Sequence, residues 1–233
     1  MRIKFKDFTG LIESFFRNDT TVPRTYQFPD KDITVAGIVD LNSLQDDIIL
    51  AGALLGSVIK AQTLGLNFTN ISAAASTLNN DRVRFFPVYL KIAATLTGVK
   101  WISRIQGNYT ASGENRIGLY SYSAGTLTLV AASANNGNLW KATANTMVAT
   151  PFSATYDAVA GLYFIGEIHN SSANVVTPAI AASTQALGDV AQSTMDLTNS
   201  ARFSSFIAAS ALPATQAMSG LTTGTNYLWF ALY

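Results

Sequence analysis

The sequence changes its pattern at Arg82-Val83-Arg84-Phe85, where polar and apolar residues begin to alternate. The alternation resumes after Pro87 in Val88-Tyr89-Leu90-Lys91-Ile92. A period of two is typical of a β-strand with one buried face. Because proline cannot donate a backbone hydrogen bond, Pro87 predicts an edge position or a bulge in this strand.

Further strand candidates follow, separated by turn-forming pairs such as Ala124-Gly125 and Asn136-Gly137. They occupy residues 99–105, 116–122, 126–130, 161–169, 173–180, 202–208 and 226–233. No long helical pattern interrupts them, which favours an antiparallel β-sandwich or jelly roll over residues 81–233. The segment 179–193, which is rich in small residues, leaves a loop and a short helix open as alternatives. The fold class we predict is mostly β.

Residues 1–80 differ from this pattern and predict a small region of helices plus a short strand at 33–41. Its first apolar series recurs at spacings of three and four, as in an amphipathic helix, and consists of Phe5, Phe8, Leu11, Ile12, Phe15 and Phe16. Such a helix either completes a local core or docks on a larger assembly.

A second helix is predicted to begin at a capping box formed by Ser43 and Asp46. Its heptad positions are Leu41, Leu44, Ile48, Ala51, Leu55 and Val58. The helix is apolar nearly all round, so it must be buried. Two interpretations stay open: a core helix of an N-terminal domain, or a helix packed against its own copies around a threefold axis.

The composition narrows the class of protein. Of the 233 residues only 12% are charged, and 15 basic residues against 14 acidic ones leave a net charge of +1. No global field therefore exists to attract nucleic acid or a membrane surface. Residues 203–233 carry no charge at all. A surface so poor in charge favours burial against copies or a partner.

Cysteine is absent, which excludes disulfides, thiolate nucleophiles and cysteine-ligated metals. The first residues carry charges but no following apolar stretch of the signal-peptide kind, so we expect synthesis without secretion, in the cytosol. The most apolar window, 48–59, is shorter than the roughly 20 residues that cross a bilayer. The sequence therefore predicts no membrane insertion.

Candidate chemical groups are few, and the sequence predicts no catalytic residue, cofactor or metal site. His169 is the single histidine and stands at the end of a predicted strand, where we expect it to face solvent. Asp157 and Glu167 are the only close carboxylate pair in the strand-rich part, as a glycosidase would need.

Aromatic and basic residues offer two further kinds of site. The aromatic residues that could stack on sugars, although a core position is favoured for them, are Trp101, Trp140, Trp229, Tyr120, Tyr122, Tyr163, Tyr227 and Tyr233. The basic residues that are close in sequence, which strand spacing would scatter over two faces, are Arg82, Arg84, Lys91, Lys100 and Arg104. We expect no nucleic-acid partner.

Several short motifs resemble a β-sandwich module of structural proteins in tailed-bacteriophage virions. They are Arg116-Ile117-Gly118-Leu119-Tyr120, Leu127-Thr128-Leu129-Val130-Ala131, Leu139-Trp140, Pro151-Phe152 and Ala160-Gly161-Leu162-Tyr163-Phe164. The likeness covers about residues 90–230, and the head fibres of crAss-like phages are the most similar members. The resemblance implies a domain displayed on the virion as a fibre or decoration, usually trimeric, with an N-terminal region that attaches it.

The combined expectation is a non-enzymatic, homotrimeric head fibre or capsid decoration, assembled in the host bacterial cytoplasm and located in the virion. The series Phe5 to Phe16 would dock on the major capsid protein or another virion structural protein, and the heptad Leu41 to Val58 would form the trimer interface. The alternative is a tail-associated receptor-binding protein that recognises host surface glycans. An enzyme acting through Asp157 and Glu167 is the remaining rival.

Overall fold

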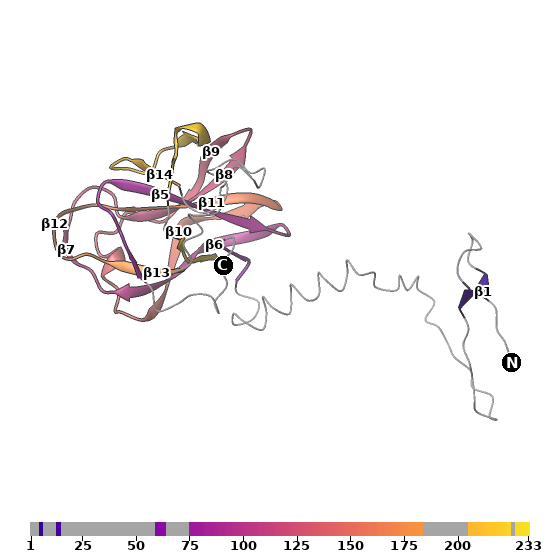
Figure 1. Cartoon of the computed structure of the whole chain (residues 1–233), viewed down its shortest axis with the longest axis horizontal. Helices are drawn as coiled ribbons and strands as arrows, with labels where there is room; N and C mark the ends of the chain where they lie inside the picture. The colour runs from indigo at the N-terminus through magenta and orange to yellow at the C-terminus, as the bar shows by residue number, and fades with distance from the viewer. Residues whose placement is uncertain (1–4, 7–12, 15–58, 64–74, 184–204, 225–226) are drawn as a thin grey trace, which may run out of the picture. The chain divides into compact units, whose positions relative to one another are not determined.

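The computed structural model describes residues 5–6, 13–14, 59–63, 75–183, 205–224 and 227–233 (Figure 1). The chain divides into two compact units, Met1–Leu44 and Gln45–Tyr233.

In the first unit, β1 (Phe5–Lys6) pairs antiparallel with β2 (Glu13–Ser14), and Phe5 lies opposite Ser14. The helix predicted across this series is therefore wrong at these residues. Gly10 stands in the middle of the series, and glycine is a poor helix former. The remaining members of the predicted docking series, the strand at 33–41 and the heptad from Leu41 to Val58 all lie outside the described residues.

The described part of the second unit is built on two large antiparallel sheets, which confirms the predicted mostly β, sandwich-type fold. Sheet I is built on β6 (Ala94–Ile105), and its other strands are β3 (Ala61–Gln62), β4 (Ala75–Thr77), β10 (Thr146–Ala158), β13 (Ala179–Ser183), β17 (Tyr227–Leu228) and β18 (Phe230–Leu232). Strand β10 pairs with β6 along one edge, and β18 and β13 pair with it along the other.

Sheet II has the order β15-β9-β8-β11-β5-β14-β16. Its strands are β5 (Arg82–Leu90), β8 (Arg116–Ser123), β9 (Thr126–Ala132), β11 (Gly161–His169), β14 (Ser205–Ala208), β15 (Thr215–Ala217) and β16 (Thr222–Thr223). A separate ribbon is formed by β7 (Asn108–Ala111) and β12 (Ser171–Val176), and the described residues also form the short 3-10 helices η2 (Leu139–Lys141) and η6 (Met218–Gly220). Strands β3 and β4 precede residue 81, the predicted start of the sandwich, and pair within sheet I.

The predicted strands match the observed ones unevenly. Strands β8, β9 and β11 lie where alternation predicted them. The predicted strand at 173–180 is divided between β12 and β13, and that at 226–233 between β17 and β18. Residues Ala179–Ser183 form a strand rather than a loop or helix. Strand β10, the longest, is absent from the sequence prediction.

Pro87 lies inside β5, which has neighbours on both sides in sheet II. The ladder between β5 and β14 ends at Phe85, so at Pro87 the strand is paired with β11 opposite Phe164. The next contact on the other side is an isolated bridge between Thr63 and Val88. Pro87 thus occupies a local edge within an interior strand, which suits a residue without an N–H group.

The main core fills the space between the two sheets. Phe86 of sheet II meets Phe230 of sheet I with ring centroids 5.3 Å apart, and Trp101 meets Trp140 at 5.0 Å. All four side chains are at most 1% exposed. Burial of such large aromatic surfaces is the principal stabilising contribution to this interior.

A second core lies on the opposite face of sheet II, beneath the segment 209–221. Phe85 and Tyr120 form its centre, with ring centroids 5.1 Å apart in an edge-on arrangement. Leu212 and Met218 cover them, and the Tyr120 hydroxyl donates to the Pro213 carbonyl over 3.0 Å. Sheet II is therefore buried on both faces, which explains the nearly continuous burial of β5 and β11.

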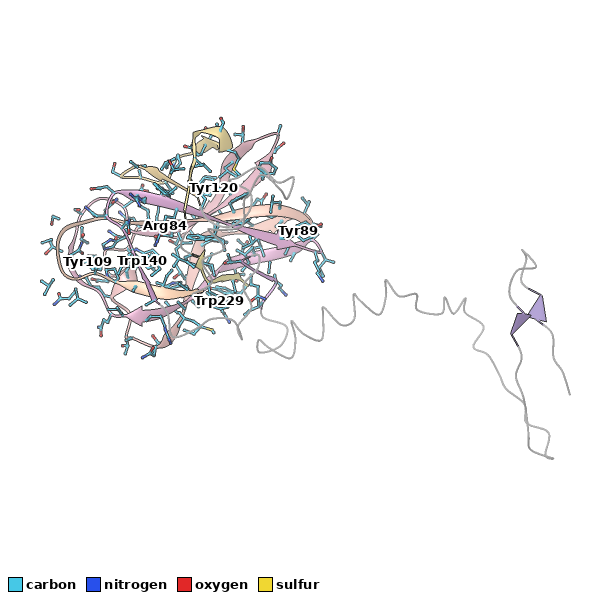
Figure 2. All side chains as sticks on the ribbon, viewed as in Figure 1. Arg84, Tyr89, Tyr109, Tyr120, Trp140 and Trp229 are labelled. Atoms are coloured by element: carbon cyan, nitrogen blue, oxygen red, sulfur yellow. The ribbon has the colours of Figure 1, made fainter. Side chains whose placement is uncertain are left out.

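The sandwich has two distinguishable ends. At the proximal end lie the turn 91–93, between β5 and β6, and the turn 159–160, between β10 and β11. Strand β3 runs in the same direction as β6, because both are antiparallel to β18, so the chain before Ala61 leads toward this end. The distal end carries the ribbon β7–β12, and Figure 2 shows Tyr89 and Tyr109 at opposite ends.

Candidate functional site

The distal half of the main core contains a buried ion pair. Arg84 on β5 and Glu167 on β11 lie directly opposite each other, and the Arg84 Nε donates a hydrogen bond to the Glu167 Oε1. The Arg84 Nη1 donates to the Thr77 carbonyl over 3.3 Å. Both charged side chains are almost completely buried. Strand alternation places them on the face of sheet II that looks toward sheet I.

His169 lies two residues beyond Glu167 and so points into the same interior. It is fully buried, which corrects the prediction that it faces solvent. The reason is the ribbon: the Tyr109 ring contacts the imidazole edge-on at 4.7 Å, and the Tyr109 hydroxyl accepts a hydrogen bond from the Trp140 backbone N–H. The end of β11 is thus covered by Tyr109, a residue that is distant in sequence.

These side chains form what we call the buried polar cluster, namely Arg84, Glu167 and His169 (Figure 2 shows Arg84 and Tyr109 in this half of the sandwich). Within the described part of the chain, four of its atoms have no hydrogen-bond partner: Arg84 Nη2, Glu167 Oε2, and His169 Nδ1 and Nε2. Buried polar groups are nearly always paired, so this cluster is the most polar and least satisfied part of the interior.

Burial controls the protonation of the cluster. It lowers the pKa of His169 to about 4, an effect that Arg84 reinforces and Asp81 opposes. Burial also raises the pKa of Glu167 above its usual value, and the Arg84 guanidinium opposes that shift. His169 is therefore neutral at pH 7, and lowering the pH would place a positive charge beside Arg84.

The cluster is not arranged for acid–base chemistry on a substrate. A general acid or base must come within hydrogen-bond reach of the group that it protonates or deprotonates. All three side chains are buried, with at most 5% of each exposed. The cluster can link the two sheets and respond to pH.

The carboxylate pair suggested by the sequence is not brought together as an accessible site. Asp157 lies on β10 in sheet I, is exposed, and accepts a hydrogen bond from the Thr95 hydroxyl over 2.6 Å. Glu167 lies in sheet II and is engaged by Arg84 in the interior. The two carboxyl groups therefore have different surroundings and partners.

The aromatic candidates mostly occupy the core, as favoured from the sequence. Trp101, Trp140, Trp229, Tyr120 and Tyr163 are each at most 3% exposed. Tyr122 is 37% exposed and Tyr233 is half-buried. The side chain of Tyr227 lies outside the described residues.

The basic candidates are distributed over both sheets, as expected. Arg82 stands 4.1 Å from the centroid of the Phe206 ring, and Lys100 stands 5.3 Å from that of Tyr233. Arg104 donates to the Asn145 side chain over 3.0 Å. Arg84 is buried and so is not part of the surface.

An asparagine network at the distal end is missing from the sequence prediction. Asn115 and Asn170 exchange hydrogen bonds: the Asn170 N–H donates to Asn115 Oδ1, and Asn115 Nδ2 donates to the Asn170 carbonyl. Asn170 Nδ2 also donates to the Ser210 carbonyl over 2.7 Å. Both asparagines are buried. Their position beside the ends of β8 and β11 was the available signal, since asparagine commonly bonds to nearby backbone at strand ends.

The ribbon β7–β12 beside this network exposes neutral side chains, of which Val175 and Val176 are apolar. Asn108, Thr110, Ser172 and Asn174 are exposed on the ribbon β7–β12, where Asn174 lies opposite Tyr109. The ribbon itself carries no charged residue. Amide and hydroxyl groups can exchange hydrogen bonds with a polar, uncharged ligand.

The predicted docking and trimer positions are nearly all outside the described residues. Phe5 belongs to β1. Phe8, Leu11, Ile12, Phe15 and Phe16, together with Leu41, Leu44, Ile48, Ala51, Leu55 and Val58, are not described and stay predictions.

In the described ranges, no helix is both long and apolar enough to cross a membrane. The same residues contain no group of three or more histidine, aspartate or glutamate side chains that could hold a metal ion. A comparison with protein-family models found no match, and a comparison with curated proteins found no related sequence.

Proposed function

We propose that the protein is a non-enzymatic structural component of a phage virion, a homotrimeric head fibre or capsid decoration. Its N-terminal region would attach to the major capsid protein or another virion protein, and its β-sandwich would be displayed. The resemblance of its strand motifs to such proteins suggested this function.

One structural observation carries the proposal. The chain before β3 leads toward the proximal end: the Lys60 N–H donates to the carbonyl of Leu232, which lies opposite Val99 in β6, over 2.8 Å. The ribbon β7–β12 lies at the other end. A sandwich attached through the chain before β3 can present its distal end away from the attachment point, as a displayed domain requires.

The interior supports a structural role. The buried polar cluster uses Glu167 and His169 within the core, where no substrate can reach them. The ribbon β7–β12 carries no charge, which suits a displayed surface that does not attract a charged ligand from a distance.

The first test is the solution mass of the full chain by light scattering. A trimer has three times 24.8 kDa, about 74 kDa. A chain that stays monomeric across micromolar concentrations would contradict the homotrimer.

The second test is binding to particles. Full-length protein should co-sediment with purified virions or capsids, and a Phe15→Asp, Phe16→Asp variant should not, because a charge opposes burial in an apolar contact. Val175→Asp is the matched control, since Val175 is 78% exposed on the distal ribbon. Equal binding by all three proteins would contradict docking through the N-terminal series.

A second candidate is a tail-associated protein that recognises host surface glycans. The neutral amide and hydroxyl side chains of the ribbon favour it, because they match the hydroxyl groups of sugars. An array of host glycans tests it: binding that is lost on Asn174→Ala would support this function, and an array without any bound glycan would oppose it.

A further inference from the structure

The proximal end carries an exposed apolar patch. It consists of Tyr89, Ile92 and Val159, which are 52%, 76% and 69% exposed, and the half-buried Leu162. Exposed apolar residues that occur singly are ordinary, but a group of them on one surface marks an interaction site. We call these four residues the proximal patch.

Strand register brings the four residues together. Tyr89 on β5 lies opposite Leu162 on β11. The turns that hold Ile92 and Val159 are neighbours, because Leu90 pairs with Gly161 on one sheet and Ala94 with Ala158 on the other. The patch therefore extends from the end of sheet II across two adjacent turns.

Chain length relates the patch to the predicted trimer helix. The heptad ends at Val58, and Ala61 already belongs to β3. Three residues of extended chain span at most about 10 Å. Because the chain before β3 leads toward the proximal end, three copies joined through this heptad would bring their proximal ends close to the common axis.

The chemistry of the patch suits contact with its own copies. Around a threefold axis, equivalent residues approach one another, so a charged side chain there meets two like charges. Tyrosine, isoleucine, valine and leucine meet without such repulsion and remove apolar surface from water. Lys91 is exposed beside Ile92 in the same turn, so this contact must leave its ammonium group in solvent.

We propose that the proximal patch packs against the proximal patches of two other copies and forms part of the trimer interface. This inference rests on the proposed homotrimer. It assigns to the sandwich a share of the self-association that the sequence attributed to the heptad alone.

The test compares three full-length proteins: wild type, Ile92→Asp with Val159→Asp, and Val175→Asp as an equally exposed control at the distal end. Light scattering over a dilution series gives the concentration at which each trimer dissociates, and circular dichroism checks that each protein is folded. We expect the patch variant to dissociate at a concentration at least about tenfold higher than wild type, because like charges at an interface oppose association. The control should match wild type.

Two results would overturn the inference in different ways. If all three proteins form trimers that dissociate at the same concentration, the proximal patch is not part of the interface although the proposed homotrimer stands. If the wild type is monomeric throughout the series, both the homotrimer and the patch contact fail.

Discussion

The two ends of the main core are equally buried but differ in chemistry. At the proximal end Leu90, Leu96 and Ala158 fill the space between the sheets with apolar atoms. At the distal end the same space contains Arg84 and Glu167. The apolar end depends on packing, which is insensitive to pH, whereas the polar end depends on an ion pair and on the protonation of its neighbours.

This difference shows that equal burial does not mean an equal contribution to stability. Transferring apolar atoms from water is favourable in itself. A buried ion pair must first overcome the desolvation of both charges, and it is often no better than an apolar pair of the same volume. The distal end is therefore the part of the core where removing a single group should have the largest effect.

Glu167→Ala should produce the largest loss. It leaves the Arg84 guanidinium buried without its counter-charge, which costs about 3–5 kcal/mol of unfolding free energy. Urea unfolding followed by circular dichroism at pH 7 measures this loss.

The control is a double variant, Arg84→Met with Glu167→Leu. It removes both charges and keeps similar volume, so it should recover most of the stability lost in Glu167→Ala. A double variant as unstable as the single one would show that the cluster contributes through packing rather than charge.

Leu96→Ala tests the apolar end. Leu96 is fully buried in the main core, and truncating such a residue costs about 3 kcal/mol through lost transfer energy and a cavity. Because no ionisable group is removed, the loss should be the same at pH 5 and pH 7.5. Independent changes usually add to within about 0.3–0.5 kcal/mol. A loss that differs by more than about 1 kcal/mol between these two pH values would therefore contradict the claim that the proximal end is insensitive to pH.

His169 should give the polar end its pH dependence. Burial holds its pKa at about 4 in the folded chain, below the ordinary value of 6.5. As the pH falls below 6.5 the unfolded chain binds a proton that the folded chain does not, so stability decreases until about pH 4 and then levels off.

The expected decrease is about 2 kcal/mol larger for the wild type than for His169→Gln, in which residue 169 cannot titrate. Unfolding curves between pH 7.5 and 4 measure both proteins. The two proteins share all their carboxylates, so the difference between their unfolding free energies leaves the contribution of the carboxylates out. If the unfolding free energies of the two proteins fall in parallel with pH, the pH response comes from groups other than His169.

The sequence predicted the strands of this sandwich better than its interior. Strands β8 and β11 combine alternation with turn-forming neighbours, which are local signals. Strand β10 lacks them: it contains Pro151, its register with β6 shifts between Pro151 and Tyr156, and it pairs with a strand that precedes it by some 40 residues.

The buried polar cluster depends on register, which a single strand does not reveal. Arg84 and Glu167 are 83 residues apart in sequence and meet because β5 and β11 pair opposite each other. His169 looks exposed at a strand end until Tyr109 of the ribbon covers it. Polar residues among apolar ones in a strand could be seen in the sequence. The residue that each of them pairs with across the sheet could not.

Tyr120→Phe should have the smallest effect on the free energy of unfolding. It removes a hydrogen bond without leaving a buried charge unpaired, as Glu167→Ala does. The Tyr120 hydroxyl donates to the Pro213 carbonyl in the second core, and Pro213 is half-exposed. Water can therefore reach the carbonyl that the variant leaves without its donor, and the ring keeps its edge-on contact with Phe85. The expected cost is about 1 kcal/mol, the usual net value of one hydrogen bond. Urea unfolding that gives a loss close to that of Glu167→Ala would mean that any polar contact in this fold is equally costly to break. A loss near 1 kcal/mol would instead assign the sensitivity of the distal end to its buried charge.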